Sequence, residues 1–174
     1  WTSRGFATRD AVGIVFTHVS PDGDQGFPGQ LVIEARYTLA RNADALTLDI
    51  TATADRPTVA NLTNHVYFNL AGQGGVACHT LRVDPDRRVE LDARKLPTGD
   101  LVPVRGTASD FASARSLAPV LKAGGIDEML VLAGERTARL SDPGSGRTLT
   151  LTTNQPGLQG FTGNACDGTD RDRA

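Results

Sequence analysis

The sequence predicts an all-β protein, an antiparallel β-sandwich, on three observations. Apolar and polar residues alternate over many short stretches, which is typical of strands that bury one face. These stretches are bounded by turn residues, chiefly glycine, proline, aspartate and asparagine. No stretch has the apolar spacing of a convincing amphipathic helix. The length and the 39% of apolar residues fit part of a single domain over residues 1–174, with a disordered charged tail at 167–174.

The first part of the chain predicts one strand followed by a hairpin. Residues 1–10 are charged and without a period, which indicates a turn or a frayed end. Alternation over residues 11–19 predicts a strand, with His18 on its apolar face, where a structural role is favoured. Alternation over residues 31–39 and 46–54 predicts an antiparallel hairpin with one buried face.

Two loops rich in turn residues have the composition of ligand-binding loops, but neither has the residue spacing that such a loop requires. Residues 20–29 contain two acids, but these lack the spacing of a calcium-binding EF-hand loop, so a solvated turn is favoured. Residues 71–75 contain three glycines, but no strand-to-helix pattern with a terminal lysine follows them, as a phosphate-binding loop requires. We therefore expect flexible turns at both places.

The stretch from Ala60 to Gly72 predicts the central strand of the fold. In a strand its polar residues would share one face and its apolar residues the other. The polar face consists of Asn61, Thr63, His65, Tyr67 and Asn69. Such a face suggests the wall of a polar cleft for a ligand with many hydroxyl groups, with the imidazole of His65 at its centre.

A simpler interpretation of this stretch stays open. A polar strand face is also typical of an antiparallel sheet that is exposed to solvent on one side. A lone histidine on a strand is ordinarily structural. The neighbouring amides and phenol around His65 are what favour a binding role over plain exposure to water.

The second part of the chain predicts short strands, at most one turn of helix, and a second hairpin. Prolines between residues 85 and 119 break longer helices. The expected strands are 79–84, 89–91, 101–104, 137–142 and 147–153, with a further apolar strand after the two acids at 127 and 128, and the helical turn falls within 116–123. His79 begins the first of these strands, with no evident partner for a ligand role. Glycines and amides in residues 155–164 predict a close approach of the backbone to a neighbour.

Asp127 and Glu128 place two carboxylates at the start of an apolar strand. Such carboxylates can accept hydrogen bonds from a ligand. They can equally be solvated charges at the exposed start of a strand, and on charge alone this second interpretation is favoured.

Composition limits the partners and the compartment. A formal net charge of −2 argues against nucleic acid or an acidic membrane surface as a partner, and no apolar run approaches a membrane span. Cys78 and Cys166 show no metal-ligand spacing and are expected to be free thiols in a reducing compartment, the cytoplasm. Because the chain starts at Trp1 and its only methionine is Met129, we expect a segment of a longer protein.

Several motifs in one order resemble the aldose 1-epimerases, also called galactose mutarotases. The hallmark is residues 61–72, Asn-Leu-Thr-Asn-His-Val-Tyr-Phe-Asn-Leu-Ala-Gly. The other matching motifs are Ser20-Pro21-Asp22-Gly23, Pro97-Thr98-Gly99, Asp110-Phe111, Asp127 before an apolar strand, Gln155-Pro156-Gly157-Leu158-Gln159, Thr162-Gly163-Asn164 and Asp167-Gly168-Thr169. The resemblance covers nearly the whole chain.

The resemblance implies a large antiparallel β-sandwich that interconverts the α and β anomers of free aldoses such as glucose and galactose. His65 matches the family's general acid, while a glutamate acts as the base. Asn64, Tyr67, Asp127 and Gln159 match sugar-binding positions or segments. No metal or organic cofactor is expected, and the partner is a monosaccharide. The sequence does not indicate the oligomeric state.

The sequence departs from the family at several positions. Glu128 stands where a histidine is usual, Gly160 replaces a bulky residue, and Phe161 replaces a usual tyrosine. The catalytic glutamate is expected beyond Ala174 and the first active-site histidine before Trp1, so the segment alone is expected to be weakly active or inactive.

Three other functions remain open at this point. The first is a non-catalytic carbohydrate-binding module of the same fold. The second is an epimerase of hexose phosphates, which the scattered arginines disfavour. The third is a purely structural β-sandwich, which would leave the polar residues around His65 unexplained.

Overall fold

The computed structural model describes residues 1–134 and 136–164, and it is built almost entirely of antiparallel strands. The chain forms two compact units, residues 1–66 and the residues from Tyr67 onward. The first unit contains β1 (Thr2–Ala7), β2 (Ala11–Ser20), a 3₁₀ turn η1 (Asp24–Gly26), β3 (Leu31–Ala40) and β4 (Leu46–Ala54). The second contains β5 (Thr80–Val83), β6 (Pro85–Leu91), β7 (Pro97–Pro103), β8 (Arg115–Ser116), α1 (Ala118–Lys122), β9 (Asp127–Leu132), β10 (Thr137–Ser141), β11 (Thr148–Thr152) and β12 (Gly157–Phe161).

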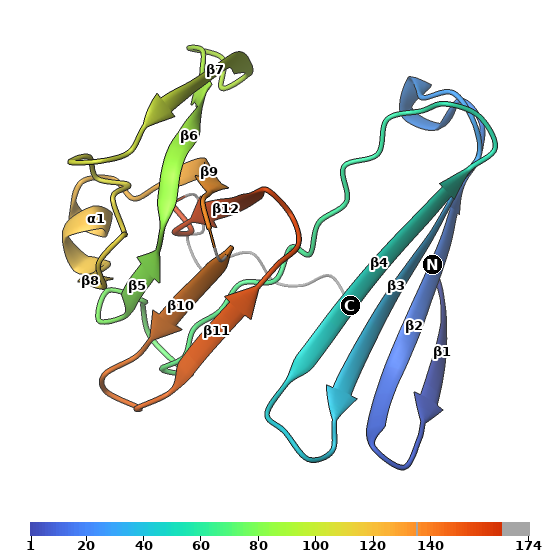
Figure 1. Ribbon diagram of the computed structural model, residues 1–174, viewed down its shortest axis with the longest axis horizontal. Helices are drawn as coiled ribbons and strands as arrows, with labels where there is room; N and C mark the ends of the chain where they lie inside the picture. Colours follow the sequence, from blue (N-terminus) through green and yellow to red (C-terminus); the bar gives the residue numbers. More distant parts are fainter. Residues whose placement is uncertain (135, 165–174) are drawn as a thin grey trace. The chain divides into compact units, whose positions relative to one another are not determined.

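The first unit is one four-stranded meander in the order β1-β2-β3-β4, drawn from blue to cyan in Figure 1. The predicted strand and hairpin are confirmed, and the register of the hairpin pairs Leu31 with Ala54 and Leu39 with Leu46. Apolar residues of neighbouring strands therefore meet on one face, as where Phe16 pairs with Ala35. The Phe16 and Tyr37 rings pack there edge to face, at a centroid distance of 6.0 Å.

The expectation of a turn or frayed end over residues 1–10 is wrong, because β1 pairs with β2 along its whole length. Phe6 lies directly opposite Gly13, and a Cβ atom at Gly13 would collide with the Phe6 ring and the Tyr37 carbonyl. The guanidinium of Arg36 lies 4.1 Å from the centre of the Phe6 ring. Cross-strand contacts thus fix a segment whose own sequence has no strand period.

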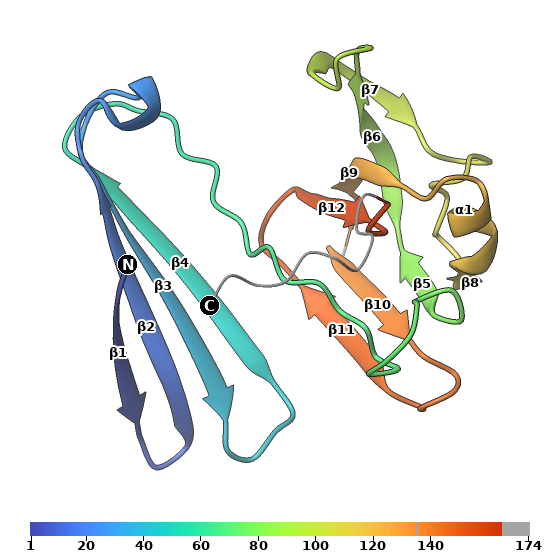
Figure 2. The ribbon, with the colours of Figure 1, turned by 180° about the vertical axis from the view of Figure 1, so that it is seen from behind.

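The second unit packs two four-stranded sheets, β11-β10-β5-β8 and β12-β9-β6-β7, around one core (Figure 2). Only Asp84 separates β5 from β6, so the chain passes directly from one sheet to the other. The buried core residues come from both sheets, from α1 and from the loops between these elements: Val83, Phe111, Leu117, Val120, Ile126, Leu130, Leu132 and Ala138. This is the predicted sandwich arrangement, and the predicted second hairpin and helical turn are confirmed within it.

The predicted central strand over residues 60–72 is not formed. Residues 57–69 contain no strand or helix, and the apolar side chains of this segment are largely exposed, at 70% for Val59 and 53% for Val66. Alternation shows which side chains would share a face, but a strand also needs a neighbour that pairs with its N–H and C=O groups. No strand of the described residues pairs with this segment.

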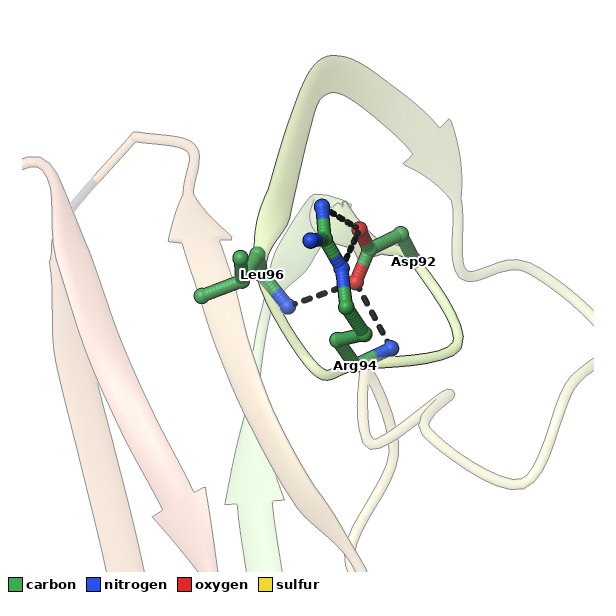
Figure 3. A network of polar contacts seen from close by, with 3 residues as sticks. All are labelled: Asp92, Arg94 and Leu96. Carbon is green, nitrogen blue, oxygen red and sulfur yellow. Dashed lines mark hydrogen bonds and ion pairs between the residues drawn. The ribbon is translucent and has the colours of Figure 1, made fainter.

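The turn that joins β6 to β7 is built around Asp92 (Figure 3). Its carboxylate accepts hydrogen bonds from the backbone N–H groups of Leu96, at 3.0 Å, and Arg94, at 2.8 Å. The Arg94 guanidinium lies 3.3 Å from the same carboxylate. The Leu96 N–H is the main reason that the pKa of Asp92 lies below its usual value.

Some expectations fall on residues outside the described part of the chain. These are the free thiol at Cys166, the Asp167-Gly168-Thr169 motif and the tail at 167–174. Cys78 is an exposed free cysteine. Over the described ranges, no helix is long and apolar enough to cross a membrane.

Candidate functional site

Asp127 and Gln159 form a hydrogen-bonded pair on the exposed face of the sheet that contains β9 and β12. The Gln159 amide Nε2 donates to Asp127 Oδ1 at 2.8 Å, although the residues lie 32 positions apart. Phe161 pairs with Asp127 in the ladder and Gln159 with Met129, so the side chains of Asp127 and Gln159 are diagonal neighbours on one face. Together they present carboxylate and amide groups that can accept and donate hydrogen bonds to adjacent hydroxyls.

Two aromatic rings border this polar pair. Phe161 lies directly opposite Asp127 in the ladder, and its ring centroid is 5.9 Å from that of Tyr67. Tyr67 is 56% exposed and Phe161 is half-buried. A sugar ring has an apolar C–H face besides its hydroxyls, so aromatic surface beside hydrogen-bonding groups suits it.

The predicted site residues do not include Phe161, because the family resemblance indicates only that it replaces a tyrosine. The signal that could have found it is the two-residue spacing from Gln159, which puts both side chains on one face of a strand.

Close packing on the two faces of β12 explains its glycines. Gly160 faces the core, where an added Cβ atom would lie 3.2 Å from Ile126 Cδ1 and 3.6 Å from Leu130 Cδ1. At Gly157 an added Cβ atom would lie 2.9 Å from the Met129 sulfur. The predicted close approach of the backbone is therefore confirmed, and it lets β12 lie tightly against β9.

A polar clamp fixes the start of β9, one residue before Asp127. The Ile126 N–H donates to Thr162 Oγ1 at 2.9 Å, and the Thr162 N–H donates to the Ile126 carbonyl at 3.1 Å. Asn164 Nδ2 donates to the same carbonyl at 3.3 Å. The Thr162-Gly163-Asn164 motif thus holds the backbone that carries Asp127.

The two carboxylates at the start of β9 serve different purposes. Glu128 is half-buried and faces away from Asp127 because side chains alternate along a strand. It accepts a short hydrogen bond from the buried Ser109 hydroxyl and lies 3.7 Å from Arg88 Nε. Of the two acids, only Asp127 therefore lies beside Gln159.

His65 and Asn64 are exposed residues of the irregular segment 57–69. They belong to the first compact unit, whereas Tyr67, Asp127 and Gln159 belong to the second. The structure thus brings together three of the five predicted site residues.

A hollow of about 280 Å³ in the first unit has a different character. Its lining is mostly apolar and consists of Trp1, Phe16, Ile33, Ala35, Tyr37, Ile50, Leu62 and Thr63. Few groups there could bind the hydroxyls of a sugar.

The described residues contain no group of three or more histidine, cysteine, aspartate or glutamate side chains that could hold a metal ion. In the loop after β2, Asp22 accepts a hydrogen bond from the Gly29 N–H at 2.6 Å. Asp24 accepts one from the Ser20 hydroxyl at 2.8 Å. Both acids therefore stabilise the loop itself, as the solvated-turn interpretation expects.

Comparison with known proteins assigns the chain to a family. The family described as aldose 1-epimerase matches residues 1–172 of the chain. The chain belongs to the aldose 1-epimerase family. Galactose mutarotase from Sus scrofa is 39% identical over 178 residues, which cover 97% of this chain and 50% of that protein. Aldose 1-epimerase from Escherichia coli (strain K12) is 34% identical and matches 90% of this chain and 49% of that protein.

Solved structures of aldose 1-epimerase relatives have the same fold. The crystal structure of galactose 1-epimerase from Lactobacillus acidophilus NCFM matches 98% of this chain and 52% of that chain, with a TM-score of 0.80 and 25% identity. The structure of the aldose epimerase homologue from C. elegans matches 90% of this chain and 50% of that chain, with a TM-score of 0.78 and 31% identity. The chain thus spans about half the length of these relatives.

Proposed function

We propose that the protein containing this chain is an aldose 1-epimerase that interconverts the α and β anomers of free aldoses such as glucose and galactose. The observation that carries the proposal is the Asp127–Gln159 pair on an exposed sheet face of a chain in this family. Relatives named galactose mutarotase and aldose 1-epimerase support this class of substrate.

In this proposal the second unit binds the sugar. Asp127 accepts hydrogen bonds from adjacent ring hydroxyls, and the Gln159 amide donates to or accepts from the next hydroxyl. Tyr67, whose ring lies near Phe161, contacts the sugar from the segment that also contains Asn64, a further hydrogen-bonding residue. A sugar bound by several such groups is oriented for reaction at its anomeric carbon.

His65 acts as the general acid in the proposed reaction. A carboxylate base removes the proton of the anomeric hydroxyl, the C1=O bond forms, and the bond between C1 and the ring oxygen breaks. His65 donates its proton to the ring oxygen, which leaves an open-chain aldehyde. After rotation about the C1–C2 bond the same transfers run in reverse and close the other anomer. Imidazole suits this role because it gives and retakes protons near neutral pH.

The reaction as written consists of proton transfers and one reversible ring opening, so the proposal includes no cofactor. We place the protein in the cytoplasm, a reducing compartment in which an exposed thiol such as that of Cys78 stays reduced.

Polarimetry of freshly dissolved α-galactose and α-glucose tests the proposed function. The full-length protein is expected to bring the optical rotation to its equilibrium value much faster than buffer does. A protein that binds galactose without changing this rate is instead a carbohydrate-binding module. The same assay on residues 1–174 alone tests the expectation that this segment is weak or inactive.

A further inference from the structure

His79 is a buried histidine that the proposed reaction does not use. Its side chain is 0% exposed, one residue before β5. Its Nε2 atom accepts a hydrogen bond from the Leu70 N–H at 2.9 Å. Within the described residues the buried Nδ1 atom has no hydrogen-bond partner. The bond to Leu70 is the one hydrogen bond that this buried side chain makes among the described residues.

The carbonyl of Leu70 is held as firmly as its N–H. It accepts hydrogen bonds from Arg147 Nη1 at 2.9 Å and from Ser145 Oγ at 3.1 Å, both from the turn between β10 and β11. Asp142 shapes this turn, because its carboxylate accepts a hydrogen bond from the Ser145 N–H at 2.8 Å. Side chains that lie 9, 75 and 77 residues away along the chain thus converge on Leu70.

We propose that His79, Ser145 and Arg147 are positioning residues for the sugar site, acting through the backbone of Leu70. This inference rests on the proposed function. Leu70 follows Tyr67 by three residues, a span of at most about 11 Å of extended chain. Residues 57–69 form no strand or helix, so no sheet ladder fixes this segment. The Leu70 anchor therefore helps to set the place from which Tyr67, whose ring also lies near Phe161, approaches a sugar.

The magnitude of the expected effect follows from the sensitivity of catalysis to geometry. A displacement of about 1 Å at a reacting group can lower the rate about a hundredfold. Release of the Leu70 backbone should therefore lower kcat strongly. The melting temperature of the sandwich should change little, because its core lies elsewhere, around Phe111 and Leu130.

The chain offers a matched control for the serine of the anchor. Ser116 Oγ donates to the Ala77 carbonyl at 3.2 Å and accepts from the Ala118 N–H at 3.2 Å. Ser145 Oγ has the same two kinds of bond, to the Leu70 carbonyl and from the Arg147 N–H. Only the serine at 145 holds the segment that contains the proposed site residues.

The test measures kcat and KM by polarimetry in the full-length protein, with amide hydrogen exchange at Leu70 as a readout besides activity. The double variant Ser145→Ala, Arg147→Met is expected to exchange faster at Leu70 and to lose about tenfold or more in kcat. Ser116→Ala should match the wild type in both. His79→Leu should behave like the double variant, whereas His79→Gln, which retains an acceptor near the Nε2 position, should recover most of the rate.

The outcomes separate this inference from the proposed function. A wild-type protein without epimerase activity counts against the proposed function. An active wild type whose double variant exchanges faster at Leu70 yet keeps its kcat and KM overturns the positioning role. If His79→Leu does not fold, the double variant of Ser145 and Arg147 still tests the positioning role, because both residues are exposed and lie outside the core.

Discussion

The amide of Gln159 donates a hydrogen bond to the carboxylate of Asp127 across two strands that are joined by a full antiparallel ladder. This bond fixes the orientation of the amide, since its nitrogen must face the carboxylate and its oxygen must face away. Each residue therefore orders the other, and the two act as one binding unit. Their substitutions should not be additive, because the first already removes the contact that the second would remove.

Replacement of either member of the pair should weaken sugar binding. Asp127→Ala and Gln159→Ala in the full-length protein should each raise the Kd for galactose about ten- to hundredfold, the equivalent of about 1.5–3 kcal/mol for hydrogen bonds that involve a charged group. The double variant should lose less than the sum of the two. Isothermal calorimetry measures these affinities.

Asp86→Ala is the control for the change in charge. Asp86 is an exposed carboxylate on β6 of the same sheet, and it lies 3.6 Å from Arg87. Its replacement should leave galactose binding unchanged. If the Asp127 and Asp86 variants bind galactose equally well, Asp127 has no place in the site.

Replacement of His65 should affect the rate rather than the binding of the sugar. His65→Ala is expected to lower kcat about a hundredfold or more, because a positioned general acid contributes about that much, while KM changes little. Polarimetry gives both constants. His18→Gln serves as the matched histidine control, since His18 stacks on Trp1 within the first sheet. Equal kcat values for wild type and His65→Ala would remove His65 from the mechanism.

Much of the fold could be predicted from the sequence because its strands are short, regular and bounded by turns. The hairpin of β3 and β4 illustrates this, since its alternation and its polar link both match the observed register. Asp127 and Gln159 could be predicted as residues of one sugar site only through the family resemblance. Nothing in the local sequence indicates that residues 32 positions apart pair.

The two failures of prediction have the same physical cause. Strand β1 has no alternating pattern, yet it pairs with β2; residues 60–72 alternate well, yet they pair with no described strand. Pairing depends on a neighbouring edge, which local periodicity does not report. The contact of His79 with Leu70 was missed for a similar reason, because a hydrogen bond to a backbone N–H leaves no signature in side-chain type.

The lowered pKa of Asp92 predicts that the free energy of unfolding depends on pH. Hydrogen bonds from the Leu96 and Arg94 N–H groups favour its charged form and hold its pKa below the usual 3.8 in the folded protein. A group with a lowered folded pKa stabilises the protein above its unfolded pKa, and that stabilisation is lost as the pH falls through the folded value. Asp92→Asn should therefore be less stable than wild type at neutral pH, with the difference shrinking below pH 3.8.

Urea denaturation at several pH values checks this expectation, with Asp100→Asn as the control for a carboxylate on the neighbouring strand β7. Direct titration of the Asp92 carboxyl carbon by NMR gives its folded pKa. A measured pKa above 3.8 would contradict the hydrogen bonding drawn in Figure 3.

Gly13→Ala tests why β1 forms. A methyl group there would collide with the Tyr37 carbonyl and with the ring of Phe6, and a backbone carbonyl within a three-strand ladder cannot move aside easily. Overpacking of this kind costs about 1–3 kcal/mol, so the variant should unfold at a lower urea concentration. Gly75→Ala is the matched control, because an added Cβ atom at Gly75 would meet nothing within 4 Å. Equal midpoints for the two variants would mean that Phe6 does not cover Gly13 in solution, and the account of β1 as a strand fixed by its cross-strand contacts would then be wrong.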